Sequence, residues 1–320
     1  MNEELSFLAI IIGIAHSGIR LATPYLYAAI GEMFAQRSGV LNLGVEGMML
    51  MGAFFGFYAV FISGSLMLGI LAAAGVGAAM GLAMAFVSVT LQAEQGISGI
   101  GFYLFGLGAS SLLFKVLLGG VEGIDGFPLL HFCLGGGTPE TNFCLSEVPV
   151  VGEIFLGHNV LVYIAFALVP AAWWFLNKTG YGLNIRAVGQ NPQAADTLGV
   201  SVARVRYATV TFGGMMAGIA GASLSISLLN LFQENLTNGL GFIAVALVYF
   251  GSWRPVGVLA GAILFSLVNA TQLWAQVLGL NIPSDVAVMM PYLLTIIVLA
   301  FPFRRAATPA ALTVPFDRSH

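Results

Sequence analysis

Glu46 is the residue of this sequence best placed to do chemistry, because it stands in a strongly apolar stretch with Asn42 one helical turn before it. An ionisable side chain is costly where water is excluded, so it is a functional candidate by default. On a helix the two side chains would share one face and could line the path of a polar solute. Two other interpretations stay open: a structural acid bonded by backbone donors where glycines interrupt the helix, or a carrier of a coupling proton.

Three further amide side chains could hydrogen-bond the same solute. They are Gln95, which stands beside Gly96, and Asn269 with Gln272 three residues later. Bonds between helices explain the last pair equally well. With Asn42 and Glu46, these residues make up the predicted substrate pathway. His16 and Arg20, also one turn apart, are expected to face lipid headgroups or to pair with an acid.

A second candidate site is a short helix in the polar loop 178–206. Asn191 is a good N-cap, Pro192 suits the first helical position, and Gly199 can adopt the left-handed conformation that ends a helix. These residues predict a helix of about two turns, roughly 10 Å long. We interpret it as a surface presented to a partner, and a chance helical turn in a loop is the alternative.

Residue patterns typical of enzymes are missing from the sequence. The four histidines, at positions 16, 131, 158 and 320, are scattered, and there is no His-Glu-x-x-His motif, nucleophile elbow or phosphate loop. The net charge of −3 is too small to suggest nucleic acid. We therefore predict no enzyme, with no catalytic residues, and no metal or cofactor bound by this chain.

The composition requires a membrane protein. Of 320 residues, 58% are hydrophobic and only 8% are charged, against about 25% charged in soluble domains. We predict an all-α, polytopic transmembrane helix bundle with about nine spans, eight to ten being possible. A polar turn is expected at 31–39. The predicted spans are 5–30, 40–62, 66–91, 99–118, 156–176, 207–229, a short one at 242–252, 255–275 and 285–302.

Stripes of small residues at four-residue spacing predict how these helices pack, since small side chains let helix backbones approach closely in lipid. One stripe lies in the third span and one in the sixth. Their members are Gly69, Ala73, Gly77, Gly81 and Ala85, and Gly213, Ala217, Gly221 and Ser225.

Positive residues orient the chain, because short cytoplasmic loops collect Lys and Arg. With the loop 178–206 inside, nine of the eleven positive residues lie inside: Arg37, Lys178, Arg186, Arg204, Arg206, Arg254, Arg304, Arg305 and Arg318. This predicts a membrane domain 1–303, a cytoplasmic tail 304–320, and an N-terminus outside. The polar segment 119–155 is then extracytoplasmic. Its two cysteines, Cys133 and Cys144, could form a disulfide or stay free.

Three blocks of sequence resemble one family. They are GEMFAQRSGVLNLGVEGMML at 31–50 followed by Gly52-Ala53, GLNIRAVGQNPQAAD at 182–196, and GFIAVA at 241–246 with GSWRP at 251–255. Together they resemble the permease subunits of bacterial ABC importers for nucleosides, in the superfamily of ribose and branched-chain amino acid permeases. The similarity covers roughly residues 23–303. Gln190 departs from the family pattern, which mostly has Glu there.

The resemblance implies a permease subunit, in a bacterial inner membrane, that couples ATP hydrolysis in partner chains to import. ATP and Mg²⁺ would be bound by the partner ATPase. A second, similar permease, an extracytoplasmic binding protein and a small-molecule solute complete the implied assembly. The resemblance also implies ATPase coupling by the loop that holds the short helix: Arg186, Asn191, Pro192, Gln193, Ala194, Ala195, Asp196, Gly199 and Arg204.

Nucleosides lead among the solutes, and an ABC permease for simple sugars is an alternative. A proton-coupled secondary transporter that uses Glu46 is another, and it predicts uptake that follows the proton gradient. A non-transporting scaffold is a third. The sequence has no soluble domain large enough to recruit partners, which counts against that scaffold.

Overall fold

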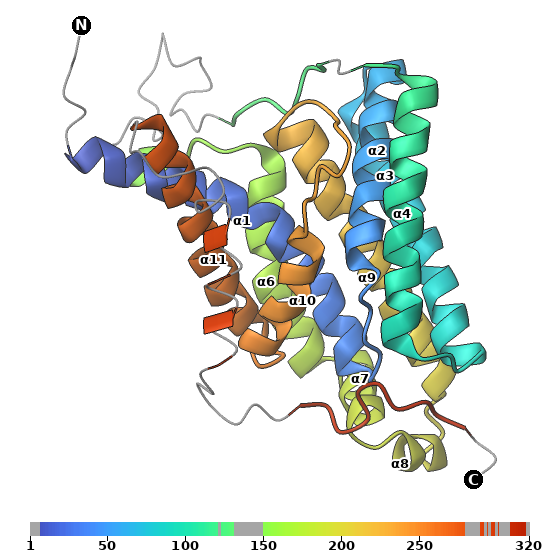
Figure 1. The fold of residues 1–320 in the computed structure, drawn as a ribbon. Coiled ribbons are helices and arrows are strands. Elements are labelled where there is room, and N and C mark those ends of the chain that lie inside the picture. The colour runs from blue at the N-terminus through green and yellow to red at the C-terminus, as the bar shows by residue number, and fades with distance from the viewer. Residues whose placement is uncertain are drawn as a thin grey trace, which may run out of the picture.

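A long helix, α1 (Phe7–Arg37), runs through the middle of the molecule, and the other long helices surround it (Figure 1). The computed structural model describes residues 7–120, 123–130, 150–278, 289–290, 293, 296–297, 300 and 308–317. Among these residues the regular elements are all helices, apart from isolated bridges, which confirms the predicted all-α class. The remaining helices are α2 (Val45–Ser63), α3 (Leu66–Ala85), η1 (Phe86–Thr90), α4 (Gln95–Leu117), α5 (Val151–Phe155), α6 (Val160–Lys178), α7 (Gly180–Gln190), α8 (Pro192–Thr197), α9 (Val202–Ser223), η3 (Leu224–Leu228), α10 (Leu240–Phe250) and α11 (Pro255–Val277).

Seven of these helices are long and apolar enough to cross a membrane: α1, α2, α3 with η1, α4, α6, α9 with η3, and α11. The shorter α10 corresponds to the predicted short span. Most of the last predicted span, 285–302, lies outside the described residues, as do Cys133 and Cys144. The structure therefore shows the predicted helix bundle, and the count of nine membrane spans stays a prediction.

Two predicted boundaries at the start of the chain are wrong. Residues 31–37 continue α1 instead of forming a turn, and the helix ends only before Gly39, whose φ is +95°. Residues 40–44, predicted as helix, form a short connection to α2. These helix ends cannot be read from the sequence, because a polar run such as 31–39 can form either a loop or a helix that is buried by the rest of the protein.

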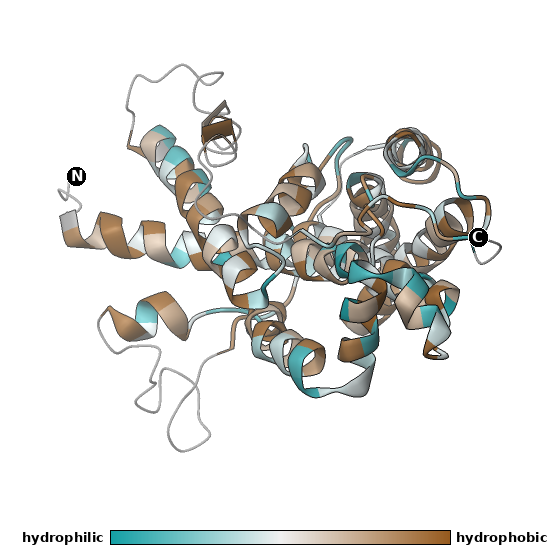
Figure 2. Cartoon of the chain, turned by 90° about the horizontal axis from the view of Figure 1, so that it is seen from below, coloured by the Kyte–Doolittle hydropathy of each residue, from teal (hydrophilic) through white to brown (hydrophobic). Residues whose placement is uncertain are grey.

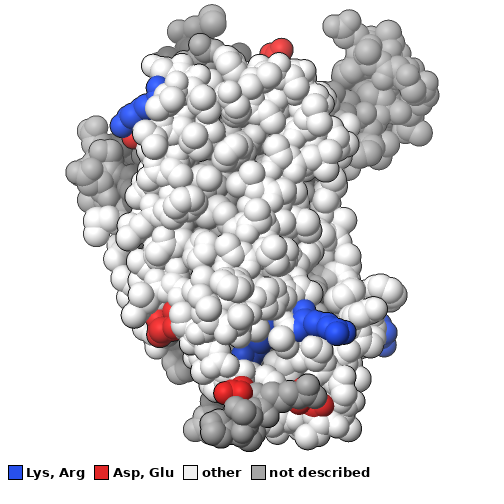
Figure 3. All heavy atoms as spheres, turned by 90° about the vertical axis from the view of Figure 1, so that its right-hand side faces the viewer, with Lys and Arg blue, Asp and Glu red and all other residues white. Residues whose placement is uncertain are grey.

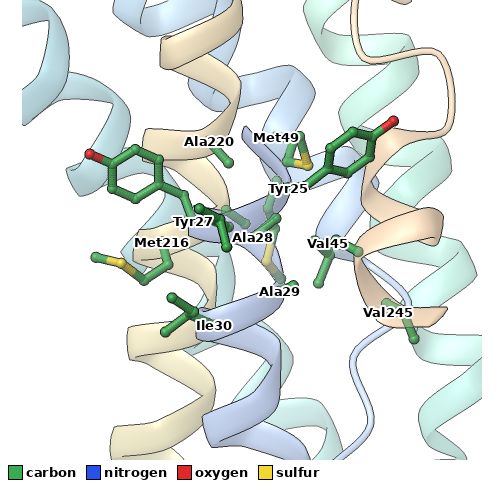
Figure 4. Packing of buried hydrophobic residues seen from close by; sticks show 14 of the residues in the cluster. Tyr25, Tyr27, Ala28, Ala29, Ile30, Val45, Met49, Met216, Ala220 and Val245 are labelled. Atoms are coloured by element: carbon green, nitrogen blue, oxygen red, sulfur yellow. The ribbon is translucent and has the colours of Figure 1, made fainter. Parts of the chain in front are cut away.

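Small residues bring α3 and α9 into backbone contact. Gly69, Gly77 and Gly81 of α3 are buried, and a Cβ added at Gly77 would collide with the carbonyl oxygen of Gly214 on α9. Small residues of α1 take part in the same core, where Ala28 and Ala29 lie among side chains of α2 and α9 (Figure 4). The predicted α3 stripe thus packs against α9, and the predicted α9 stripe packs against α1 and α2, where Gly213 faces Gly31 and Gly221 faces Met49.

Replacing Gly77 by leucine should destabilise the bundle, because the new side chain has no room against the α9 backbone. We expect a loss of roughly 1–3 kcal/mol, the usual effect of overpacking. Gly75, two residues earlier on α3, has open space around its Cα, so Gly75→Leu is the matched control. Thermal unfolding of the two purified variants checks the prediction, and equal melting temperatures would contradict it.

Charged residues gather toward the two ends of the bundle. The face in Figure 3 shows a broad middle band without Lys, Arg, Asp or Glu, and viewed from below the long helices are largely apolar while hydrophilic residues gather on the turns (Figure 2). The lower end, which carries α7 and α8, is called the α8 end below. The N-terminal start of α1 lies at the opposite end (Figure 1).

Candidate functional site

The short helix predicted from its caps is present as α8. The Asn191 side chain accepts a hydrogen bond from the Ala194 N–H at 3.0 Å, and Pro192 occupies the first turn. At the other end Gly199 has φ +85°, and its N–H donates to the Asp196 carbonyl at 2.9 Å. The preceding α7 was not predicted, although Thr179 caps it through a hydrogen bond from the Gly182 N–H.

One face of α8 is fixed to the bundle. Ala195 is only 3% exposed and packs with Val188 of α7 and Val202 of α9 in a small apolar cluster, to which Phe316 adds. Pro192 is buried as well. This inner face holds the helix in place, so Ala195 positions α8 and does not itself present a contact surface.

The other face of α8 is open. Gln193, Ala194 and Thr197 are exposed, and Asp196 is half-buried. Leu198, just past the helix, is 85% exposed, the highest value among the large hydrophobic side chains that are described as exposed. A partner docked on this face would remove that apolar side chain from water. Leu198 was not predicted from the sequence, although an isolated Leu between Thr and Gly in a polar loop was a signal.

The two arginines predicted to flank this surface lie apart. Arg204 is exposed in the first turn of α9. Arg186 of α7 is half-buried and lines a cavity with Arg37 and Arg254. Arg204 is therefore the more exposed of the two near α8.

A stretch that sequence reasoning left as a plain tail, residues 308–317, is here called the C-terminal strap. It crosses the α8 end beside α7 (Figure 1). The Ala311 N–H donates to the Gly189 carbonyl at 2.9 Å, and the Thr313 N–H donates to the Gly39 carbonyl at 3.1 Å. Buried Arg206 donates to the carbonyls of Ser38 at 3.2 Å and Val314 at 3.0 Å. Through these hydrogen bonds the strap connects α1, α7 and α9 at the α8 end.

Glu46, in the first turn of α2, lies in the core beside the start of α10 and is 1% exposed. Its carboxylate accepts three hydrogen bonds: from the Thr237 hydroxyl at 2.5 Å, the Gly239 N–H at 2.7 Å and the Gly241 N–H at 2.6 Å. A helix N-terminus is a favourable place for a carboxylate, because its N–H groups lack partners within the helix. The geometry therefore makes Glu46 an anchor between α2 and the segment that leads into α10.

Asn42 and Gln95 support the connection between α1 and α2. The Asn42 side chain accepts from the Gly44 N–H at 2.9 Å, and the Gln95 side chain accepts from the Leu41 N–H at 2.8 Å. Both side chains are buried. With Glu46, three of the five predicted pathway residues thus gather around the start of α2 and bind backbone there.

The remaining two pathway residues, Asn269 and Gln272, lie on α11. This helix packs against α1, α6 and α10. Gln272 is buried and Asn269 half-buried. The five residues consequently belong to two separate places in the bundle.

Glu32 is a buried acid that sequence reasoning placed in a turn. One carboxylate oxygen accepts from the Gln36 side chain at 2.9 Å and from the Asn42 N–H at 3.0 Å, and the other oxygen has no hydrogen-bond partner. Gln36 in turn accepts from the Trp253 indole N–H at 2.8 Å. The four-residue spacing of Glu32 and Gln36 was a signal that the helix continued.

His16 and Arg20 bond to backbone. His16 meets the Glu153 carbonyl at 2.7 Å and stacks on His158 with ring centroids 4.4 Å apart, and Arg20 donates to the Leu228 carbonyl at 3.1 Å. Burial, helped by the nearby His16 and Arg20, holds the pKa of His158 below its usual range. These contacts join α1 to α5, to η3 and to the residues just before α6, at the end opposite α8.

Comparisons with known proteins give one family. The model of the branched-chain amino acid transport system / permease component family matches residues 14–299. The chain is 34% identical to the guanosine ABC transporter permease protein NupQ of Bacillus subtilis, covering 92% of this chain and 93% of that protein. It is 34% identical to the nucleoside ABC transporter permease protein NupC of Lactococcus lactis subsp. cremoris, covering 93% and 94%.

A further relative, TsgC13 of Haloferax volcanii, is provisionally named as a glucose ABC transporter permease protein. It is 39% identical over 96% of this chain and 98% of its own length. No solved structure matches the chain.

Proposed function

This chain belongs to the branched-chain amino acid transport system / permease component family, and on that premise we propose that it is the membrane-spanning permease subunit of an ATP-driven nucleoside importer. The chain is a multi-pass membrane protein, and seven of its described helices are long and apolar enough to span. As a transport subunit it would leave ATP hydrolysis, with ATP and Mg²⁺, to a partner ATPase.

The observation that carries the proposal is the construction of α8. It is capped at both ends, packed on one face and open on the other, with Leu198 exposed at its tip. A helix held so firmly can pass a push from a docked partner to the bundle without bending. We propose that the ATPase contacts Gln193, Ala194, Leu198 and the exposed part of the Asp196 side chain.

The same proposal orients the chain. The α8 end carries Arg37, Lys178, Arg186, Arg204, Arg206 and Arg254 and would therefore be cytoplasmic. The opposite end, with the described residues 123–130 and 150–155, would then meet an extracytoplasmic binding protein. A second, similar permease would complete the membrane part in a bacterial inner membrane.

The solute would pass near the start of α2, at the interface with the second permease. There Asn42, Glu46 and Gln95 hold backbone in place, so we propose that they shape the wall of the pathway. The three donors on Glu46 favour an anchor over a carrier of protons. Because its carboxylate already accepts these three hydrogen bonds, we favour the ATP-driven importer over the proton-coupled transporter.

Nucleosides are the proposed solute because two relatives that match nearly the whole chain are named for guanosine or nucleosides. A simple sugar is the second candidate, because TsgC13 matches at 39% identity and is named for glucose. Uptake of labelled guanosine in cells with and without the chain, competed by unlabelled glucose, separates the two. Guanosine uptake that glucose suppresses would count against a nucleoside importer.

The assembly is tested by capture from native membranes. The chain carries a tag after residue 320, beyond the strap, and the proteins that remain bound after gentle extraction are identified by mass spectrometry. We expect an ATPase and a second, similar permease. Recovery of the chain alone, in a form that still supports gradient-driven uptake, would overturn the importer.

Replacing Asp196 by arginine should uncouple ATP hydrolysis from uptake. The side chain lies half-buried at the end of α8, where a reversed charge changes the surface that the ATPase meets. Hydrolysis and uptake are measured together in reconstituted vesicles, with melting temperature as the check on folding. A variant that transports at the normal ratio would show that the contact surface is elsewhere.

A further inference from the structure

A cavity of 490 Å³ at the α8 end brings three arginines together. Arg37 comes from the end of α1, Arg186 from α7 and Arg254 from the residue before α11. No Asp or Glu is among its described lining residues. The guanidinium of Arg37 is repelled by both of the others. Three like charges that converge from three elements favour the binding of an anion between them.

Within the described part of the chain, much of the hydrogen-bonding capacity of these arginines is unused. Arg37 donates through Nε to the Trp253 carbonyl at 2.8 Å, and Arg186 donates through Nε to the Gly182 carbonyl at 3.4 Å. Each guanidinium has five N–H donors, so their terminal NH₂ groups can turn to a ligand. Planar, forked donors of this kind suit phosphate oxygens particularly well.

The start of α11 adds to the attraction. This helix has 23 residues, its first turn begins at Pro255 beside the cavity, and no side chain caps it. The partial positive charge of a helix N-terminus adds to that of the arginines. The arginine cluster and the N-terminus of α11 both favour an anion at the same place.

The surroundings place that anion at the membrane surface. Trp173 of α6 lines the cavity and is 45% exposed, and its neighbour Trp174 is 58% exposed. Tryptophans near the end of a spanning helix are typical of headgroup depth. Val256, which also lines the cavity, is 61% exposed and offers an apolar surface to an acyl chain.

We propose that this cavity binds the phosphate of an anionic phospholipid headgroup, with Arg186 and Arg254 as its main ligands. Basic pockets between spanning helices on the cytoplasmic side are suited to such headgroups. A bound lipid would join α1, α6, α7 and α11 at the base of the α8 end. The inference is independent of which solute the chain transports.

The test uses the full chain, purified in a neutral detergent and stripped of lipid. Short-chain phosphatidylglycerol, phosphatidylcholine and inorganic phosphate are each titrated, and binding is followed by native mass spectrometry and thermal shift. We expect phosphatidylglycerol to bind at least ~10-fold tighter than phosphatidylcholine, and inorganic phosphate to produce no comparable shift. Arg186→Gln and Arg254→Gln should each weaken phosphatidylglycerol binding by about 10-fold.

Lys178→Gln is the matched control, because it removes one exposed positive charge at the same end, outside the cavity. It should leave phosphatidylglycerol binding within about two-fold of the unmodified chain. An equal loss in Lys178→Gln, or equal binding of the two lipids, would overturn the proposal. Inorganic phosphate binding as strongly as the lipid would instead identify a soluble phosphate ester as the ligand.

Discussion

Replacing Glu46 by alanine should destabilise the folded bundle by roughly 3–5 kcal/mol. The substitution leaves the Thr237 hydroxyl and the N–H groups of Gly239 and Gly241 without their acceptor in a buried place. Each unsatisfied buried donor costs about 1–3 kcal/mol. The segment that enters α10 would lose its attachment to α2, and the measurement is thermal unfolding of the purified chain.

Two milder variants separate the role of Glu46 as an anchor from a role in carrying protons. Thr237→Val removes one of the three donors and should cost less than Glu46→Ala. Glu46→Gln keeps one good acceptor and should retain ATP-dependent uptake in proportion to the folded protein. If Glu46→Gln is as stable as the unmodified chain and yet transports nothing, the side chain acts in transport itself and the anchor is the wrong account.

Replacing Leu198 by aspartate should abolish uptake while leaving the chain folded. The side chain is 85% exposed, so its loss changes stability by no more than about 0.5 kcal/mol. At a docked interface a buried leucine anchor replaced by a charge should cost about 2 kcal/mol or more, a loss of roughly 30-fold in affinity. The amount of ATPase that co-purifies with the tagged chain gives the direct measurement.

Ala203→Asp is the control for Leu198→Asp. Ala203 is also exposed at the α8 end, on α9, so the control adds the same charge outside α8. It should retain most of the ATPase and most of the uptake. Equal losses in the two variants would mean that added negative charge, and not the loss of the apolar anchor, weakens docking.

Local signals in the sequence were sufficient for α8. An N-cap side chain, a proline at the first position and a glycine with positive φ act within a few residues, so Asn191, Pro192 and Gly199 predict both ends. The small-residue stripes were equally informative, because their spacing fixes a helix face whatever the partner is. Both features depend on contacts that lie close in the sequence or repeat along it.

Contacts between distant segments could not be read in the same way. Nothing near Glu46 in the sequence shows that its carboxylate oxygens accept hydrogen bonds from residues 237–241, about 190 positions later. Similarly, Ala195 was expected on an open surface, and only the packing of Val188, Val202 and Phe316 shows that it faces inward. Long-range partners decide whether a polar or small residue holds the fold or meets a ligand.

The C-terminal strap has a consequence for biogenesis. Its hydrogen bonds to Gly39 and Gly189 and the packing of Phe316 complete the base on which α8 rests. These residues leave the ribosome after every described helix of the bundle. The α8 surface therefore reaches its final form only late in synthesis, and we expect nascent chains that end before residue 308 to expose an unfinished surface that quality-control proteases can recognise.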